Sequence, residues 1–260
     1  MLPFERLRAL ARYDGDDAML VEEVADCLAD FDADPTQLVL VCRRLLAHHP
    51  VNGALWWLCA RVVGASVPAR AVAEARRVRD RDRTVARLVS VLPFPHDEPV
   101  AVLGWPTAVA AALDERPDLD VVSVRPPRSS APRPYGVRSI DVTEALALGC
   151  SHLLVEPLLT GATEARVPAG TAELRASLPD AVLWLVVPVD RLLPDRLVAA
   201  VRRVTDATDD PFAADDAPGA PGEWLDVASV DRVAGPGGLE SPERLARRVD
   251  CPAAPELTRL

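Results

Sequence analysis

Residues 152–174 read HLLVEPLLTGATEARVPAGTAEL. The run HLLV is apolar and ends at turn residues, which is typical of a strand buried on both faces of a sheet. A loop containing Gly161 and Gly170 follows, and Gly170-Thr171 precedes a segment with a helical pattern. This order of strand, loop and helix is the repeating unit of α/β folds, so the stretch predicts that class.

Three further apolar runs resemble the strand in this stretch: EPVAVLGWP, residues 98–106; DLDVVSV, residues 118–124; and AVLWLVVP, residues 181–188. They alternate with helix-like segments such as TAVAAALDERP and GTAELRASLP. The alternation predicts a Rossmann-like, mainly parallel sheet with flanking helices. Ligands of such sheets bind at the carboxyl ends of the strands, so the residues that follow each run are the candidates for a site.

Before residue 94 the pattern is helical. In DADPTQLVLVCRRLLAHHP, residues 32–50, Asp34 can cap a helix whose first turn contains Pro35, and His48-His49 lies at its end, where a cation complements the helix dipole. We therefore predict a helical N-terminal region over 1–93 and an α/β domain over 94–260. An acidic, flexible insertion is expected near 205–222, and the Arg-containing loop 125–134 is expected to be a solvated connection.

The composition narrows the classes of function. The 260 residues carry a formal charge of −10, which disfavours broad binding to nucleic acid or to anionic lipid. No residue is lysine, so lysine-based chemistry is excluded. The five cysteines are scattered and predict buried free thiols rather than a metal site. With no apolar run long enough to span a membrane, we expect a cytoplasmic protein, and the single glycine of VLGWPTAV argues against a dinucleotide cofactor.

The order of these features resembles the superfamily of initiation factor 2B regulatory subunits and methylthioribose-1-phosphate isomerase, which also includes ribose-1,5-bisphosphate isomerase. The segments GCSHLLVEP, PAGTAEL, PDAVLWLVVP and WLDVASVDRVAGPGG carry the resemblance, which covers approximately residues 36–250. It implies a NagB/RpiA/CoA-transferase-like fold and a homodimer. The chain looks like a degenerate bacterial member of this superfamily.

Three departures from the isomerase pattern affect the expected chemistry. Leu158 stands where the resemblance implies the catalytic carboxylate, and of the family's Asn-Lys-x-Gly-Thr only Gly170-Thr171 remains. The stretch after the first strand, 103–107, contains no cysteine at the position of the family's thiol. Because aldose isomerisation requires a group that moves protons, the resemblance implies a non-catalytic protein that binds a phosphorylated metabolite or nucleotide, or acts through protein association.

Two alternatives remain open. A sugar-phosphate isomerase could have rebuilt its site from Glu156, Asp190 or Asp226, and a purely structural interaction protein could have filled its pocket with Trp105 and Leu158. For a phosphate ligand, the candidate binding residues are Gly170, Thr171, Trp105 and Thr107. At Gly170-Thr171 the reason is that backbone N–H groups at a helix N-terminus bind anions, whereas Trp105 could cover a crevice at a strand's carboxyl end. Gly170-Thr171 can equally form an ordinary turn and cap, and Trp105 can be a core wedge.

Overall fold

The computed structural model describes residues 3–13, 15–31, 34–92, 99–125, 136–208 and 222–259. Within the chain it defines two compact units, each assembled from separate segments. The first, called the helical unit here, comprises Met1–Arg81, Asp190–Gly219 and Val249–Leu260. The second, the sheet unit, comprises Asp82–Val189 and Ala220–Arg248. The predicted class, an α/β protein with a helical N-terminal region and a mainly parallel sheet, is confirmed.

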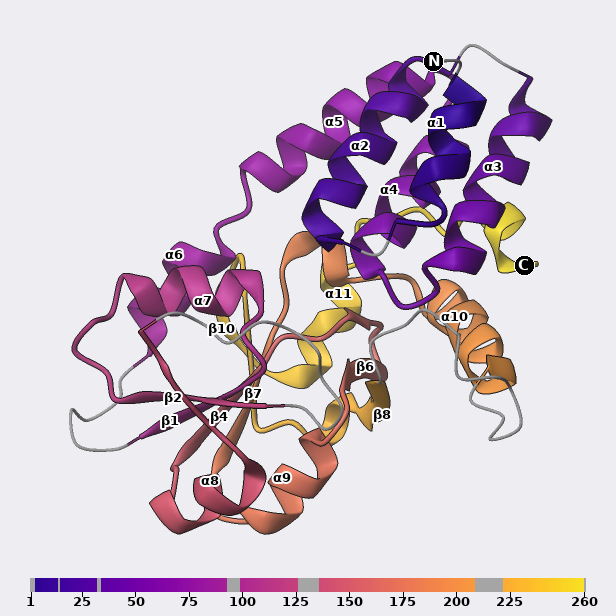
Figure 1. The fold of residues 1–260 in the computed structure, drawn as a ribbon. Coiled ribbons are helices and arrows are strands. Elements are labelled where there is room, and N and C mark those ends of the chain that lie inside the picture. The colour runs from indigo at the N-terminus through magenta and orange to yellow at the C-terminus, as the bar shows by residue number, and fades with distance from the viewer. Residues whose placement is uncertain are drawn as a thin grey trace. The chain divides into compact units, whose positions relative to one another are not determined.

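The described part of the helical unit contains six α-helices and a C-terminal 3₁₀ turn (Figure 1). Their bounds are α1 Pro3–Leu10, α2 Asp17–Ala29, α3 Pro35–His48, α4 Gly53–Val63, α5 Pro68–Asp80, α10 Asp195–Thr208 and the turn η4 Pro255–Thr258. The predicted cap of α3 forms, because the Thr36 N–H donates to Asp34 Oδ1 at 2.9 Å, next to Pro35. Asn52 caps α4 in the same way through the Leu55 N–H at 2.9 Å. Among the described helices, none is long and apolar enough to cross a bilayer.

The last residues of the chain, Val249–Leu260, belong to the helical unit. The predicted boundary at residue 93 assigns them to the α/β domain. The Arg43 guanidinium donates to the Glu256 carbonyl at 2.6 and 2.8 Å, and Arg203 donates to the Thr258 carbonyl at 2.7 Å. Arg61 pairs with Asp250 at 2.6 Å. These contacts join segments far apart in sequence, so no change of local pattern marks them.

Seven strands form the main sheet of the sheet unit. Their bounds are β1 Val100–Leu103, β2 Val121–Val124, β3 Arg138–Ile140, β4 His152–Val155, β7 Val182–Val186, β9 Arg232–Gly235 and β10 Gly238–Glu240. The order across the sheet is β10-β9-β7-β4-β1-β2-β3, and every pairing is parallel except that of β10 with β9. All four apolar runs identified in the sequence are strands of this sheet.

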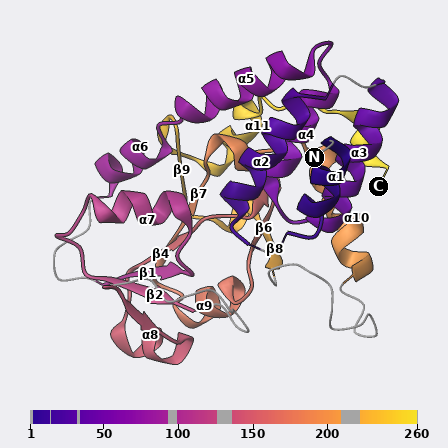
Figure 2. The ribbon, with the colours of Figure 1, turned by 45° about the horizontal axis from the view of Figure 1, so that its top comes forward.

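Helices cover both faces of this sheet. Their bounds are α6 Thr84–Val91, α7 Thr107–Asp114, α8 Val142–Leu148, α9 Thr171–Ser177 and α11 Leu245–Arg248. Leu88 of α6 and Val109 of α7 pack with Val102, Trp184 and other strand residues in one buried cluster. Figures 1 and 2 both place α8 and α9 on the opposite face. This division follows from right-handed crossovers, since the chain moves from β1 toward one edge and from β3 back toward the other.

The loop predicted after β4 contains two strands instead. β5 Leu159–Thr160 and β6 Glu164–Pro168 form an antiparallel hairpin, and β6 also pairs with β8 Gly222–Asp226 to give a second, three-stranded sheet. The segments are short and partly polar, so they lack the long apolar run that identifies a central strand. Most of the predicted acidic insertion and nearly all of the loop 125–134 lie outside the described residues.

All five cysteines are free and buried. Burial raises the pKa of the Cys251 thiol from its ordinary value of 9.0 to about 12, and burial also raises the pKa of Cys150. A hydrogen bond to Cys42, together with burial, raises the pKa of Cys59. These thiols therefore hold little of the reactive thiolate at neutral pH.

We predict that the native chain reacts slowly with a thiol reagent such as DTNB at pH 8. A pKa rise of about 3 units lowers the thiolate fraction of Cys251 by about 1000-fold, and burial also restricts access of the reagent. All five thiols should react rapidly in 6 M guanidinium, with Cys251→Ser reducing that final count by one. A fast-reacting thiol in the native protein that is lost in Cys251→Ser would contradict this assignment.

Candidate functional site

The main sheet has a topological switch point between β1 and β4. From β1 the chain continues to β2 and β3 on one side, whereas from β4 it continues to β7 and β9 on the other. In open α/β sheets, ligands bind at the carboxyl ends of the two strands that flank such a point. The residues that follow Leu103 of β1 and Val155 of β4 therefore define the candidate site.

Glu156 follows β4 directly and is 5% exposed. Its Oε2 accepts hydrogen bonds from the N–H groups of Ala108 at 3.0 Å and Val109 at 3.4 Å, both in the first turn of α7. The first N–H groups of a helix have no partner within the helix, and the helix dipole favours a negative charge there. The chain's own carboxylate thus occupies the anion position of this helix.

The turn between β1 and α7 supports this arrangement. Gly104 has a φ of 73°, and its N–H donates to the Val124 carbonyl at 2.8 Å. Ser123 Oγ donates to the Gly104 carbonyl at 2.8 Å, which fixes the turn from the neighbouring strand β2. Trp105 is partly buried against the hydrophobic cluster under α6 and α7, and Thr107 is an exposed residue at the start of α7.

The predicted anion position, at Gly170 and Thr171, is also engaged by the protein. Gly170 has a φ of 92°, a conformation that favours glycine, and Thr171 is fully buried with its hydroxyl donating to the Pro168 carbonyl at 2.7 Å. The Ala172 N–H, in the first turn of α9, donates to Glu223 Oε1 at 2.5 Å. A carboxylate of this chain therefore caps α9, as Glu156 caps α7.

The other two carboxylates proposed for a rebuilt site have structural partners. Asp226 is exposed and accepts from the Ala228 N–H at 2.9 Å, which caps the short turn that follows β8. Asp190 belongs to the helical unit, where its carboxylate pairs with Arg79 at 3.3 Å. Glu156 and Asp226 belong to the sheet unit, so the three acids are not components of one compact unit.

Glu223 was not among the site residues predicted from the sequence. It lies 51 residues from Ala172 and reaches α9 because β8 pairs with β6 in a register that places Glu223 opposite Val167. Nothing in the local sequence GEWLD, residues 222–226, specifies which strand β8 pairs with. Within the described residues, no group of three His, Cys, Asp or Glu side chains is arranged to hold a metal ion.

Solved structures with a similar fold include three from two related groups. The translation initiation factor eIF-2B of Pyrococcus horikoshii OT3 has a TM-score of 0.62 at 12% identity, with 93% of this chain and 98% of that chain covered. The chain has the eIF2B fold. The tetrameric eIF2B-beta2-delta2 complex of C. thermophilum gives 0.66 at 12% identity, covering 94% and 92%. The 5-methylthioribose 1-phosphate isomerase of Pyrococcus horikoshii OT3 gives 0.59 at 12% identity, covering 95% and 86%.

No protein-family model and no curated protein sequence matches the chain. At 12% identity, the structural likeness establishes the fold alone. The activity has to be inferred from the residues of this chain. The structures with a similar fold include both an eIF2B complex and a sugar-phosphate isomerase, as the resemblance of the sequence segments predicted.

We predict that removing the charge of Glu156 destabilises the protein. Glu156→Gln keeps an acceptor but loses the charge at the α7 N-terminus, so we expect a loss of about 1 kcal/mol in the free energy of unfolding. Glu156→Ala leaves two N–H groups without that acceptor and should cost about 2–3 kcal/mol. Urea denaturation measures both changes.

Glu115 is the matched control, because it is exposed at the carboxyl end of the same helix α7. The dipole disfavours a negative charge there, so Glu115→Gln should leave the stability unchanged or raise it by about 0.5 kcal/mol. Equal losses in Glu115→Gln and Glu156→Gln would show that the carboxylate of Glu156 does not act through the helix N-terminus.

Proposed function

We propose that this protein is a non-catalytic, eIF2B-like protein that acts through protein association. The observation that carries the proposal is the use of its own carboxylates, Glu156 and Glu223, at the N-termini of α7 and α9, the second of which was the predicted anion position. A bound phosphate would meet a tethered negative charge at each position. Repulsion between the ligand and these carboxylates therefore disfavours phosphate binding at this edge of the sheet.

The alternative of a rebuilt isomerase has less support. Proton transfer between neighbouring carbons needs a group within hydrogen-bond distance of the substrate, free to accept and return the proton. Glu156 is engaged in helix capping, and Asp226 caps the turn after β8. Leu158, at the position of the family's carboxylate, has no proton to exchange.

The partner class in this proposal is protein. One similar structure is a tetrameric complex of eIF2B beta and delta subunits, which supports association as the role of this scaffold. We infer that this chain forms a homodimer and acts in the cytoplasm. Leu239, 45% exposed on the terminal strand β10, and Leu146, 39% exposed on α8, are apolar side chains available to an interface.

The decisive experiment for the crevice measures thermal unfolding of the full chain with ribose 5-phosphate and 5-methylthioribose 1-phosphate. Thr107 and Ala172 are exposed in the first turns of α7 and α9, so Thr107→Glu and Ala172→Glu add a negative charge where the ligand would sit. Thr107→Gln and Ala172→Gln are neutral controls of similar size. We expect each ligand to give the same melting shift in wild type and in all four variants.

A shift of several degrees in wild type and in the Gln controls that disappears in either Glu variant would overturn the proposal, because it would place a phosphate ligand at the sheet edge. Isomerase assays on that ligand would then follow.

Sedimentation velocity tests the association. The monomer has a mass of 27.9 kDa, and we expect a species of about twice that mass at micromolar concentration. Sedimentation as a monomer up to about 100 µM would refute the homodimer and leave only association with another protein.

A further inference from the structure

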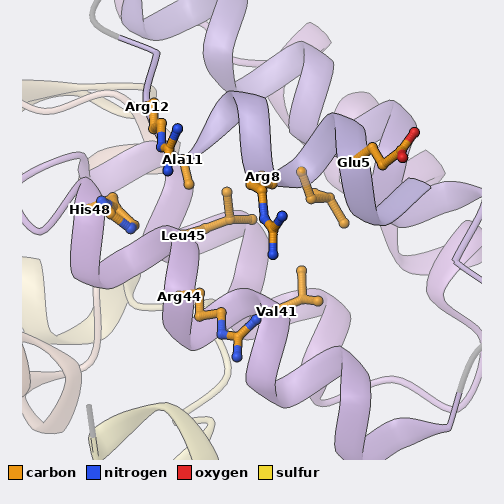
Figure 3. Close-up of a pocket in the computed structure, with 9 residues that line it drawn as sticks. Glu5, Arg8, Ala11, Arg12, Val41, Arg44, Leu45 and His48 are labelled. Carbon is orange, nitrogen blue, oxygen red and sulfur yellow. The ribbon is translucent and has the colours of Figure 1, made fainter. Parts of the chain in front are cut away.

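The helical unit contains a pocket of about 470 Å³ between α1 and α3 (Figure 3). Val41 and Leu45 line it with apolar side chains, and Arg8, Arg12 and Arg44 line it with guanidinium groups. This volume is within the range of small-molecule sites, which combine an apolar lining with a few polar groups. The pocket is separate from the sheet edge, since all of its lining residues belong to the helical unit.

Helical spacing explains why the cations meet. Arg44 and His48 are four residues apart on α3, as are Val41 and Leu45, so each pair shares a helix face. Arg8 and Arg12 have the same spacing at the end of α1, where hydrogen bonds from Ala11 to Leu7 and from Arg12 to Ala9 continue the last turn. Figure 3 shows side chains from the two helices meeting around one hollow.

The two helices are joined at one end of the pocket. His49, the residue after α3, donates from Nε2 to the carbonyl of Leu10, the last residue of α1, at 2.9 Å. This hydrogen bond holds the two walls together next to His48. The pocket therefore depends on packing between α1 and α3.

The three arginines of the pocket are exposed and have no acidic partner among the described residues. On the same two helices, Arg6 pairs with Glu23, and Arg43 donates to the Glu256 carbonyl. In the described part of the chain, no hydrogen bond or ion pair is found for the side chains of Arg8, Arg12 or Arg44. The chain carries a net charge of −10, so three arginines around one pocket form a local concentration of positive charge.

The helix dipole accounts for only part of this cluster. Cations in the last turn of a helix are stabilised by the nearby carbonyl groups, which applies to Arg8 in α1 and to His48 in α3. Arg44 precedes the last turn of α3, so the dipole gives no comparable reason for its position. Its guanidinium is available to a ligand.

The charge of the lining selects the ligand class. Three arginines and Glu5 give a net charge of 3 − 1 = +2, with Glu5 at the opposite end of the cluster from His48 in Figure 3. A phosphate monoester carries about −1.5 to −2 at neutral pH, whereas a carboxylate carries −1. Guanidinium groups bind phosphate oxygens in a bidentate manner. We propose that this pocket binds a phosphate monoester with an apolar face, of the size of a nucleoside monophosphate.

The test is isothermal titration of the full chain with AMP, adenosine and inorganic phosphate. AMP combines the dianion with a flat base that can cover Val41 and Leu45, so it should bind at least about tenfold more tightly than either fragment. Arg8→Gln/Arg44→Gln removes two charged hydrogen-bond donors and should raise the Kd for AMP by at least about tenfold. Ala11→Phe should weaken AMP as well, by filling the pocket without changing its charge.

The matched control is Arg70→Gln/Arg81→Gln, which removes the same charge from exposed positions on and after α5 in the same unit. We expect its Kd for AMP to stay within about twofold of wild type. Failure of wild type to bind AMP at about 10 mM, or equal weakening in the control, would overturn the proposal. Thermal unfolding without ligand verifies that every variant is folded.

The same titrations separate this inference from the proposed function. If Thr107→Glu abolishes AMP binding and Arg8→Gln/Arg44→Gln leaves it unchanged, the ligand binds at the sheet edge, and both proposals fail. If only Arg8→Gln/Arg44→Gln and Ala11→Phe weaken AMP binding, the pocket is the site, and the proposal that the sheet edge binds no phosphate stands.

Discussion

The first N–H groups of α7 need an acceptor outside the helix, because no carbonyl within the helix can reach them. They lie at the switch point of the main sheet. Glu156 supplies that acceptor from the end of the adjacent strand β4. The contact requires β4 beside β1, and it requires the turn at Gly104 that starts α7 above that junction. One buried carboxylate thus links the strand order, the turn and the start of the helix.

An intramolecular acceptor also changes the competition for this position. A free anion would have to displace a carboxylate that is already attached and oriented, and would lose translational freedom in doing so. Glu223 presents the same obstacle at α9. In the helical unit, the groups around the α1–α3 pocket are cations instead of carboxylates. The other arginines of these two helices have partners: Arg6 pairs with Glu23, and Arg43 donates to the Glu256 carbonyl.

The sequence predicted the elements that depend on local pattern. Four strands were recognised because continuous Val/Leu runs are buried on both faces, and α3 was recognised from Asp34, Pro35 and its apolar spacing. The strands β3, β5 and β6 were missed, because their two to five residues carry no comparable run. Glu156 was identified as a strand-end acid, but its capping role depends on a partner 48 residues away. The capping role of Glu223 was not predicted for the same reason, since only the pairing of β8 with β6 brings this residue to α9.

The helical unit is closed by the last segment of the chain, Val249–Leu260. During synthesis, α3 leaves the ribosome about 200 residues before Glu256, whose carbonyl receives the Arg43 guanidinium. The contacts of Arg61 with Asp250 and of Arg203 with Thr258 also await this segment. The helical unit can therefore complete its native contacts only after translation has passed these residues, although its first five helices are made before the sheet unit. The surfaces that receive these contacts therefore stay exposed while the sheet unit is being made.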